Sequence, residues 1–352
     1  MTPPILPATK VPAEATLEID MRLGFIGGCG HHYLRGLLGD PETAPDLDVA
    51  FSGDGGDDAA ARDFAETMGR GSWFDAPSAM LDAFRPEVVS VGAVYGLNGD
   101  RIAEALERGA AVSSDKPIAA TWEQLGRLRK IVADRGGVRL VTELPFRCRA
   151  EFRAARDAVA AGLIGDVVLA TAQKSYRFGV RRPAWYADRA SYAGTMLWVA
   201  SHGVDAIGFV AGRRIVRAIG RQGNVSKPEY GRMEDHCVAL CELEGGATGL
   251  VHADFLRPAA AATHGDDRLR VAGSTGVIEV RDARCKLVTA DRPEEDITDR
   301  AESPPMHREI LRCLQGEPTD LCDTSQSLEL AAVLLACRDA ADEQCAVDVP
   351  VP

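Results

Sequence analysis

A glycine-rich turn between an apolar run and a helical pattern constrains the fold of this chain most. The apolar run ends at Ile26, the turn covers residues 27–32, and apolar residues recur at helical spacing from 33 to 38. Glycines allow the backbone to turn sharply and to approach a diphosphate group, while the N–H groups at the start of the helix face the anion. This order predicts a dinucleotide site with contacts from Gly28, Cys29, Gly30, His31 and His32.

The next predicted strand is followed by an acid where a dinucleotide fold needs one. The strand covers residues 47–52, and Asp54 lies about 24 residues after Gly30, near the roughly 20 residues expected for the acid that binds the adenosine ribose. The glycine pattern is incomplete, because Tyr33 stands where a third glycine belongs. A helix start without a ligand therefore remains an alternative. Residues 54–58 contain acids but no lysine or arginine, which favours NAD over NADP.

Strand and helix patterns alternate from residue 21 to residue 142, which we expect to form a dinucleotide-binding domain. The strand patterns fall at 22–26, 47–52, near 73, 88–92, 111–114 and 138–142. Such alternation predicts a doubly wound parallel sheet of the Rossmann type. Ligands bind beyond the carboxyl ends of parallel strands, so the segments after Gly92 and Ser114 should face the cofactor. Their candidate cofactor contacts are Tyr95, Asn98, Asp115 and Lys116.

The second half, residues 143–352, is predicted to form a domain for substrate binding and oligomerisation. Closely spaced strand patterns at 167–172, 215–221, 236–243, 247–255, 268–272, 277–280 and 285–289 predict an α+β domain with one large, mostly antiparallel sheet. Helices on one face would leave an open-faced sheet, and we expect that face to join subunits of a homodimer or homotetramer. Residues 1–20 carry four prolines and are expected to be a disordered extension.

The composition excludes several classes of function. The net charge is −12 without a basic block, which argues against nucleic acid as a partner. The wholly apolar run of residues 331–337 in the last predicted helix is far shorter than the ~20 residues of a membrane span. The nine cysteines are scattered, and Cys237 and Cys241 lie at strand rather than metal-ligand spacing. We therefore expect a cytoplasmic protein with reduced thiols and no metal site.

Two segments carry residues that suit proton and charge chemistry. Lys116 follows a predicted strand and precedes Pro117, which stops the strand and fixes the exit of the chain. The alternative is a solvated surface lysine. His202 and Asp205 lie one helical turn apart in an apolar segment that begins near Gly194. The alternative for His202 is a histidine satisfied within the core.

Together these segments resemble the family of glucose-fructose oxidoreductase, inositol dehydrogenase and rhizopine catabolism proteins (Gfo/Idh/MocA), over essentially all of residues 21–352. The resemblance implies a nicotinamide cofactor, a sugar-like or polyol substrate between the domains, and Lys116 near the carbon that gives up hydride. Lys116 and His202 are then the expected catalytic residues. The matching segments are Ile26-Gly27-Gly28-Cys29-Gly30, Asp115-Lys116-Pro117 in place of the usual Glu-Lys-Pro, Gly194 through His202-x-x-Asp205, and Gly273-Ser274-Thr275-Gly276.

The chain departs from the family pattern four residues before His202, where Trp198 replaces the usual carboxylate. A carboxylate within ~4–6 Å raises the pKa of a neighbouring cation by about 1–3 units. Without it, Lys116 and His202 should both lose a proton more easily, and either one can be the base. Trp198 either stacks on a sugar face or belongs to the core. The expected substrate contacts are Arg147, Trp185, Tyr186, Trp198 and Asp205.

Three functions follow from this reading. The leading hypothesis is an NAD-dependent dehydrogenase that transfers hydride between the cofactor and a hydroxyl or keto carbon of a sugar, polyol or sugar acid. The second is a lyase or glycosidase of the same family that uses NAD only transiently. The third is a non-catalytic NAD-binding regulator, which Trp198 suggests.

Overall fold

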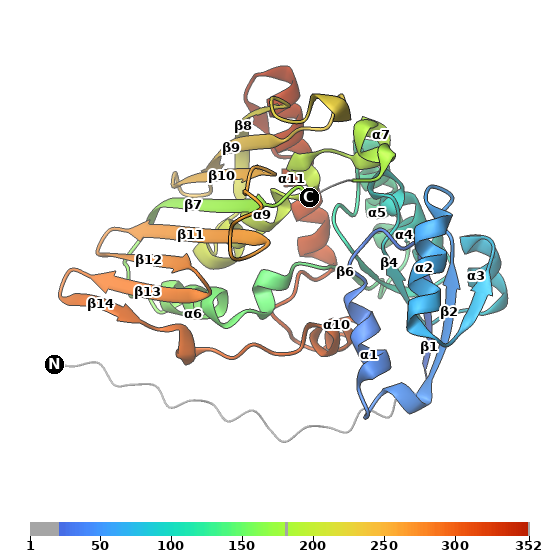
Figure 1. Ribbon diagram of the computed structural model, residues 1–352. Helices are drawn as coiled ribbons and strands as arrows, with labels where there is room; N and C mark the ends of the chain where they lie inside the picture. The colour runs from blue at the N-terminus through green and yellow to red at the C-terminus, as the bar shows by residue number, and fades with distance from the viewer. Residues whose placement is uncertain (1–20, 180–181, 351–352) are drawn as a thin grey trace.

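The computed structural model describes residues 21–179 and 182–350, so the expectation for residues 1–20 lies outside the described residues. The first half forms a six-stranded parallel sheet in the order β3-β2-β1-β4-β5-β6 (Figure 1). Its central strand β4 is buried along its whole length because helices cover both faces. The doubly wound parallel sheet is confirmed. Its strands are β1 Met21–Ile26, β2 Leu47–Ser52, β3 Ser72–Phe74, β4 Val88–Val91, β5 Ala111–Ser114 and β6 Leu140–Thr142.

Two helices of this half, α2 and α5, begin at side-chain caps. The Asp57 carboxylate accepts from the backbone N–H of Ala60 at the start of α2, and the Thr121 hydroxyl caps α5 in the same way. A C-terminal helix, α10, packs on the segment after the glycine turn and on β5 and β6. The second half of the chain thus helps to cover the parallel sheet. These helices are α2 Asp58–Met68, α3 Pro77–Ala83, α4 Asn98–Glu107, α5 Trp122–Asp134 and α10 Met306–Leu314.

The helix after the glycine turn is much shorter than a dinucleotide fold usually has. It consists of a 3₁₀ turn, η1 Tyr33–Arg35, and a single α-helical turn, α1 Gly36–Gly39. His32, the residue before it, has a left-handed φ of 44°, and this conformation interrupts the helical backbone between the turn and the helix. Pro41 lies two residues after the end of the helix, and it disfavours a helical conformation at Asp40, which is extended. The expected helix is therefore present only as two short turns.

The second half forms a nine-stranded mixed sheet in the order β14-β13-β12-β11-β7-β10-β9-β8-β15. Among the described strands of this second sheet, only the β7–β10 pair is parallel, which confirms a mostly antiparallel sheet. Two edge strands, β14 and β15, were not predicted, because β14 is wholly exposed and β15 is short. The strands are β7 Val167–Tyr176, β8 Ile215–Gly223, β9 His236–Leu243, β10 Thr248–Asp254, β11 Gly265–Gly273, β12 Gly276–Arg281, β13 Arg284–Thr289, β14 Arg292–Asp296 and β15 Val347–Asp348.

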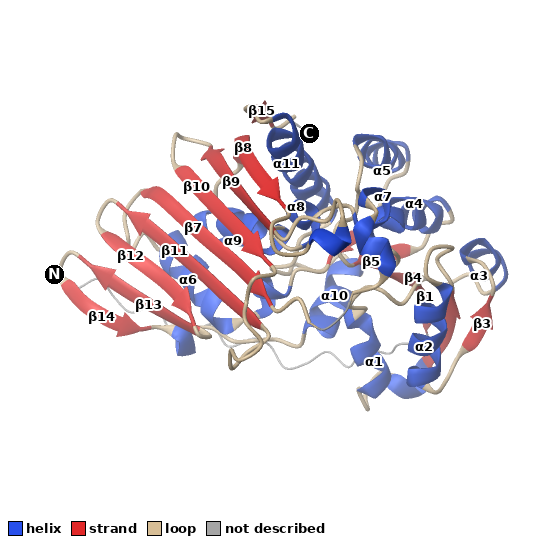
Figure 2. Ribbon diagram, turned by 45° about the horizontal axis from the view of Figure 1, so that its top comes forward, coloured by secondary structure: helices blue, strands red, loops and turns tan. Residues whose placement is uncertain are grey.

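Helices lie on one face of this sheet, and the other face is open (Figure 2). The covering helices are α6 Ala150–Ala160, α9 Ser201–Ala211 and α11 Thr324–Glu343. Among the described residues, no helix is long and apolar enough to cross a membrane. The open face carries exposed apolar side chains, among them Val168, Ile219, Val238, Leu240 and Val288.

Candidate active site

Lys116 lies at the carboxyl end of β5 and contacts the glycine turn. The residue is almost fully buried, at 1% exposed. The Nζ atom lies 2.7 Å from Oδ1 of Asp115 and 3.2 Å from Nδ1 of His31. The backbone N–H of His31 donates to the other oxygen of Asp115 at 3.1 Å. The end of β5 and the glycine turn therefore share one charged cluster.

Asp115 supplies the carboxylate that the sequence at position 198 lacks. Burial alone would raise the pKa of Asp115, but the charges of Lys116 and His31 outweigh burial and hold that pKa well below its usual value. Asp115 is thus ionised and paired with Lys116. The expectation that Lys116 has no neighbouring carboxylate is wrong, because it considered only the residue four positions before His202.

A second buried acid, Glu143, follows β6 and lies close to this cluster. The hydroxyl of Ser113 donates to its Oε1 at 2.8 Å, while Oε2 has no partner among the described residues. Burial, with a contribution from the charge of Asp115, raises the pKa of Glu143 to about 8. Glu143 is therefore protonated at neutral pH.

This raised pKa predicts how stability depends on pH. Between pH 4.5 and about 8 the unfolded chain loses the Glu143 proton while the folded chain keeps it, so the free energy of unfolding should fall as pH rises. The expected loss is on the order of a few kcal/mol. Urea unfolding of the wild type and of Glu143→Gln across this range should give curves that converge toward pH 5 and separate toward pH 8, with the wild type the less stable. Two parallel curves would contradict the assignment.

His202 lies on α9 and is neutral at physiological pH. Its side chain is 2% exposed, and its Nδ1 atom has no hydrogen-bond partner among the described residues. Burial first, and then the charges of Lys116 and Lys174, lower the pKa of His202 well below its ordinary value. This direction agrees with the expectation from the sequence. A buried, neutral imidazole with an unpartnered nitrogen can accept a hydrogen bond or a proton from a ligand.

Sequence reasoning missed Lys174, a second lysine buried on β7. Its Nζ atom lies 2.6 Å from Oδ1 of Asp267, its register partner on β11, and 4.7 Å from the ring centroid of Tyr176. Burial lowers the pKa of Lys174 to about 8 despite Asp267. The predicted strand ended at residue 172, whereas β7 continues to Tyr176 and places Lys174 on the buried face with Ala170 and Ala172. Lys174 continues the every-second-residue spacing of Ala170 and Ala172, and this spacing is the sequence signal that predicts its burial.

Trp198 packs between the two halves of the chain. Its ring is 7% exposed and stacks on Tyr95 at 4.9 Å between centroids, and Nζ of Lys116 lies 5.8 Å from the Trp198 ring. Tyr186 joins this contact through a 3.1 Å bond between its hydroxyl and that of Tyr95. The neighbouring indole, Trp185, donates to Asp57 at 3.2 Å. Trp198 is therefore mainly a core residue, although one part of it borders a cavity.

That cavity, of about 240 Å³, lies between the glycine turn and the ends of the second sheet. Lys116 contacts two of its walls, His31 and Trp198, and Lys174 contacts a third, Tyr176. Its lining residues are Cys29, Gly30, His31, Tyr95, Tyr176, Arg182, Trp198 and His264.

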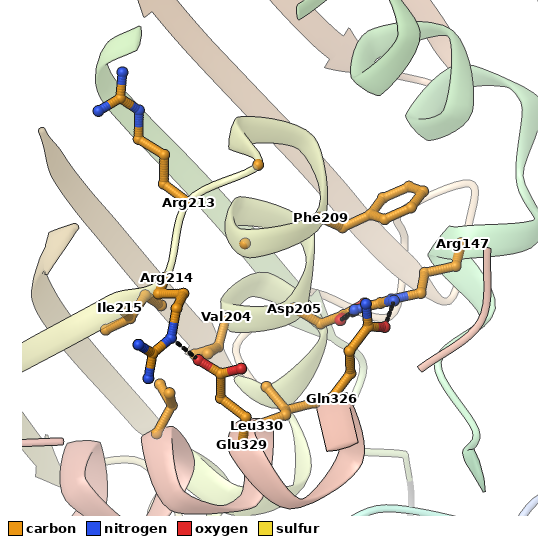
Figure 3. Close-up of a pocket in the computed structure, with 13 residues that line it drawn as sticks. Arg147, Val204, Asp205, Phe209, Arg213, Arg214, Ile215, Gln326, Glu329 and Leu330 are labelled. Carbon is orange, nitrogen blue, oxygen red and sulfur yellow. Dashed lines mark hydrogen bonds and ion pairs between the residues drawn. The ribbon is translucent and has the colours of Figure 1, made fainter. Parts of the chain in front are cut away.

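Arg147 and Asp205 do not line this cavity. The Arg147 guanidinium donates to the Asp205 carboxylate from Nε and Nη2, with a shortest distance of 2.7 Å, and to Gln326 of α11. This pair borders a separate cavity of about 340 Å³ between α9 and α11 (Figure 3). Two arginines across that cavity have partners of their own: Arg214 pairs with Glu329, and Arg213 donates to the backbone of Glu244.

Comparison with protein families shows what this arrangement belongs to. Residues 23–143 match the model of an oxidoreductase family with an NAD-binding Rossmann fold, and residues 152–279 match the GFO/IDH/MocA C-terminal domain. The chain belongs to the Gfo/Idh/MocA family of oxidoreductases. Its resemblance to that family is thereby confirmed, and NAD is the cofactor of the family's Rossmann domain.

Three named proteins are similar to this chain in sequence or in structure. A D-glucoside 3-dehydrogenase of Escherichia coli (strain K12) is 30% identical over 162 residues, so the match spans 45% of this chain and 45% of that relative. A Thermotoga maritima structure named as an oxidoreductase has a TM-score of 0.86 and 26% identity, covering 94% of this chain and 100% of that one. An inositol dehydrogenase homolog from Azotobacter vinelandii, complexed with NAD⁺, has a TM-score of 0.75 and 19% identity, covering 93% and 97%.

The glycine turn of this Gfo/Idh/MocA chain is closed onto β4. A Cβ atom at Gly30 would lie 2.5 Å from the Cα of Gly92, so only glycine fits there. The N–H groups of Cys29 and Gly30 both donate to the carbonyl of Gly92, at 2.8 and 3.0 Å. The residue types fit a dinucleotide, but these donors are already bonded within the protein. Binding a diphosphate at this turn therefore has to displace them.

The other candidate cofactor residues of this Gfo/Idh/MocA chain also make internal bonds. The buried Asp54 carboxylate accepts from the backbone N–H groups of Gly56, Asp57 and Val94 at 2.6–2.8 Å. Asn98 connects the segments after β4 and β5 through Ala93 and the carbonyl of Pro117. His32 lies beneath the turn between Ser90 and Gly27, and burial lowers its pKa to about 4. These side chains shape the edge of the sheet.

Proposed function

We propose that this chain is an NAD-dependent dehydrogenase that transfers hydride between the cofactor and a hydroxyl or keto carbon of a sugar, polyol or sugar acid. The observation that carries the proposal is the buried Lys116 ammonium, fixed by Asp115 and placed 3.2 Å from His31 of the glycine turn. Relatives named for glucoside and inositol support a substrate of this class. Hydroxyl oxidation needs a cation where alkoxide charge develops, and Lys116 meets that need.

In this proposal His202 acts as the base and Lys116 as the cation that stabilises the reacting oxygen. Neutral His202, with its unpartnered Nδ1, takes the hydroxyl proton, and Lys116 stabilises the oxygen as negative charge develops. Bound NAD would supply the hydride acceptor. Trp198 and Tyr95 border the substrate site, and Trp185 and Tyr186 contact Tyr95. Arg147 and Asp205 take no part, because they are paired with each other.

The test is a spectrophotometric screen with NAD and a panel of sugars, polyols and sugar acids. We expect NADH absorbance to rise with at least one panel member, and to rise more slowly with NADP. Arg101 donates to the backbone of Asp54 but is paired with Glu104, so it offers little to a 2′-phosphate. No NADH from any member, despite measured NAD binding, would refute the dehydrogenase proposal. Product without net NADH would support the lyase or glycosidase alternative.

A non-catalytic NAD-binding regulator is the second candidate, favoured by Trp198 in place of the family's carboxylate. It predicts that wild-type protein binds NAD and a sugar-like ligand without turnover. In that case Trp198→Asp should retain ligand affinity and gain no activity. Measurable turnover by the wild type excludes this candidate.

We also propose that the open face of the nine-stranded sheet joins subunits in a homodimer or homotetramer. Ile219 and Leu240 are register partners on β8 and β9, and both are exposed there. Exposed apolar patches of this kind mark contacts between proteins. In sedimentation experiments Leu240→Glu should shift the wild-type oligomer toward monomer. A wild-type protein that sediments only as monomer would refute the proposal.

A further inference from the structure

We infer that the cavity beside the glycine turn binds an anionic group of the substrate, a carboxylate or a phosphate, and that Arg182 is the residue that binds it. The inference rests on the proposed dehydrogenase function and narrows its substrates to sugar acids or sugar phosphates. It assigns Arg182 as a specificity-determining residue that no sequence motif indicated.

The first observation is that the charge of Arg182 is not neutralised by the described residues. Its Nε donates to the carbonyl of Phe178 at 2.9 Å, and Nη2 lies 3.5 Å from the carbonyl of Arg177. No carboxylate among the residues that the structure describes forms an ion pair with it. Two of the three arginines that line the other cavity differ, because Arg147 and Arg214 each have a carboxylate partner, whereas Arg213 donates to a backbone carbonyl. Arg182 is thus a cation held by neutral groups at the wall of a cavity.

The second observation is that aromatic rings fix the Arg182 guanidinium in place. Its Cζ atom lies 5.4–6.0 Å from four ring centroids, and the rings come from the segment after β7, from the 3₁₀ turn η5 Ala184–Ala187, from α8 Thr195–Trp198 and from the residue after β10. Because the planar fork is already oriented, binding a carboxylate or phosphate costs little further ordering. The four rings are those of Phe178, Tyr186, Trp198 and Phe255.

The third observation is that no aspartate or glutamate of the described residues lines this cavity, although the chain carries a net charge of −12. Arg182, His31 and His264 supply its charged and imidazole donors. Two acids close to lining residues are already engaged, since Asp115 pairs with Lys116, and Asp267 pairs with Lys174 and Arg149. A ligand in this cavity meets hydrogen-bond donors and aromatic faces, which suit an acidic sugar.

Two ligands can bring an anion here: the acid group of a substrate or the diphosphate of the cofactor, whose turn also lines the cavity. The volume of about 240 Å³ favours the smaller one, because sites that enclose drug-sized ligands measure about 300–1,000 Å³. We therefore assign the anion to the substrate.

Calorimetry on wild type, Arg182→Gln, Arg182→Lys and Arg214→Gln tests the assignment. The probes are D-gluconate and D-glucose 6-phosphate, with sorbitol and D-glucose as neutral matches, and NAD in a separate titration. We expect the wild type to bind at least one acid about tenfold or more tightly than its neutral match. Arg182→Gln should abolish this preference, Arg182→Lys should retain part of it, and Arg214→Gln should leave it unchanged, while all four bind NAD alike.

Two outcomes would overturn the inference. One is a wild type without preference for either acid over its neutral match, a result that does not depend on any variant. The other is a loss of NAD affinity in Arg182→Gln with the acid preference retained, which would assign Arg182 to the cofactor. The readout is binding, so it is separate from the proposed activity. Oxidation of neutral polyols without acid preference would refute this inference alone, and acid binding without turnover would refute only the dehydrogenase proposal.

Discussion

Replacing Lys116 with methionine and Asp115 with asparagine in one chain should lower kcat by about 10³-fold, the size expected when a preorganised charge at the reacting oxygen is lost. The double replacement is needed because Lys116→Met alone would leave the Asp115 carboxylate buried without its lysine, which typically costs about 3–5 kcal/mol of stability. Steady-state kinetics on a substrate from the screen give kcat, and thermal unfolding shows whether the variant is folded.

A matched control pair lies on the surface helix α5 of the same half of the chain. Lys130 and Asp134 on α5 form a pair of the same types at the same 2.7 Å separation, but both side chains are mostly exposed. Lys130→Met with Asp134→Asn should leave kcat unchanged and alter stability by less than about 1 kcal/mol. Equal loss of activity in both double variants, or full activity in the Lys116 variant, would contradict the assigned role.

Gly28→Ala should be the most damaging single-methyl change in the glycine turn. The new Cβ atom would lie 2.2 Å from the carbonyl oxygen of Ala60 and 2.6 Å from the nitrogen of Ala61, both backbone atoms of α2. Since neither can move without shifting the helix, we expect a loss of about 2–3 kcal/mol in the free energy of unfolding. Displacement of the turn should also weaken NAD binding by about tenfold or more, measured by calorimetry on folded protein.

Gly39→Ala is the matched control for this prediction. Gly39 ends α1, a few residues further along, and no atom lies within 4 Å of a Cβ atom built there. This substitution should leave stability and NAD affinity unchanged or raise stability slightly, since alanine restricts the unfolded chain. If Gly28→Ala and Gly39→Ala change stability and NAD affinity equally, close packing of the turn on α2 does not determine either quantity.

The fold was predictable because it depends on hydrophobic patterns that can be recognised within short stretches of the sequence. Buried parallel strands such as β4 appear as continuous apolar runs, and the strands of the second sheet appear as short alternating segments between turns. The lengths of the helix after the turn and of β7 were not predictable in this way. The left-handed backbone of His32 shortens the helix after the turn. In β7, polar residues interrupt the alternation of apolar residues, so the sequence pattern does not show where the strand ends.

The candidate site was predictable only where residues are close in sequence. The motif around Lys116 was visible, but its pairing with His31 and the closure of the turn depend on contacts across the sheet. Lys174 and Arg182 reach the site from the second sheet and the segment after β7, and neither lies in a motif. Asp54 was expected to bind ribose from its spacing, whereas its carboxylate caps three backbone N–H groups. Spacing gives the position of a side chain but not its partners.

Net hydride transfer is the central claim, and isotope transfer measures it most directly. The protein is supplied with NADH that carries deuterium at the transferable position, together with a panel of keto sugars and keto sugar acids, and the products are analysed by mass spectrometry. The account predicts an alcohol product that has gained one deuterium on the reduced carbon, and almost none when Lys116 and Asp115 are replaced together. Products without deuterium, or no reduction of any panel member, would contradict it.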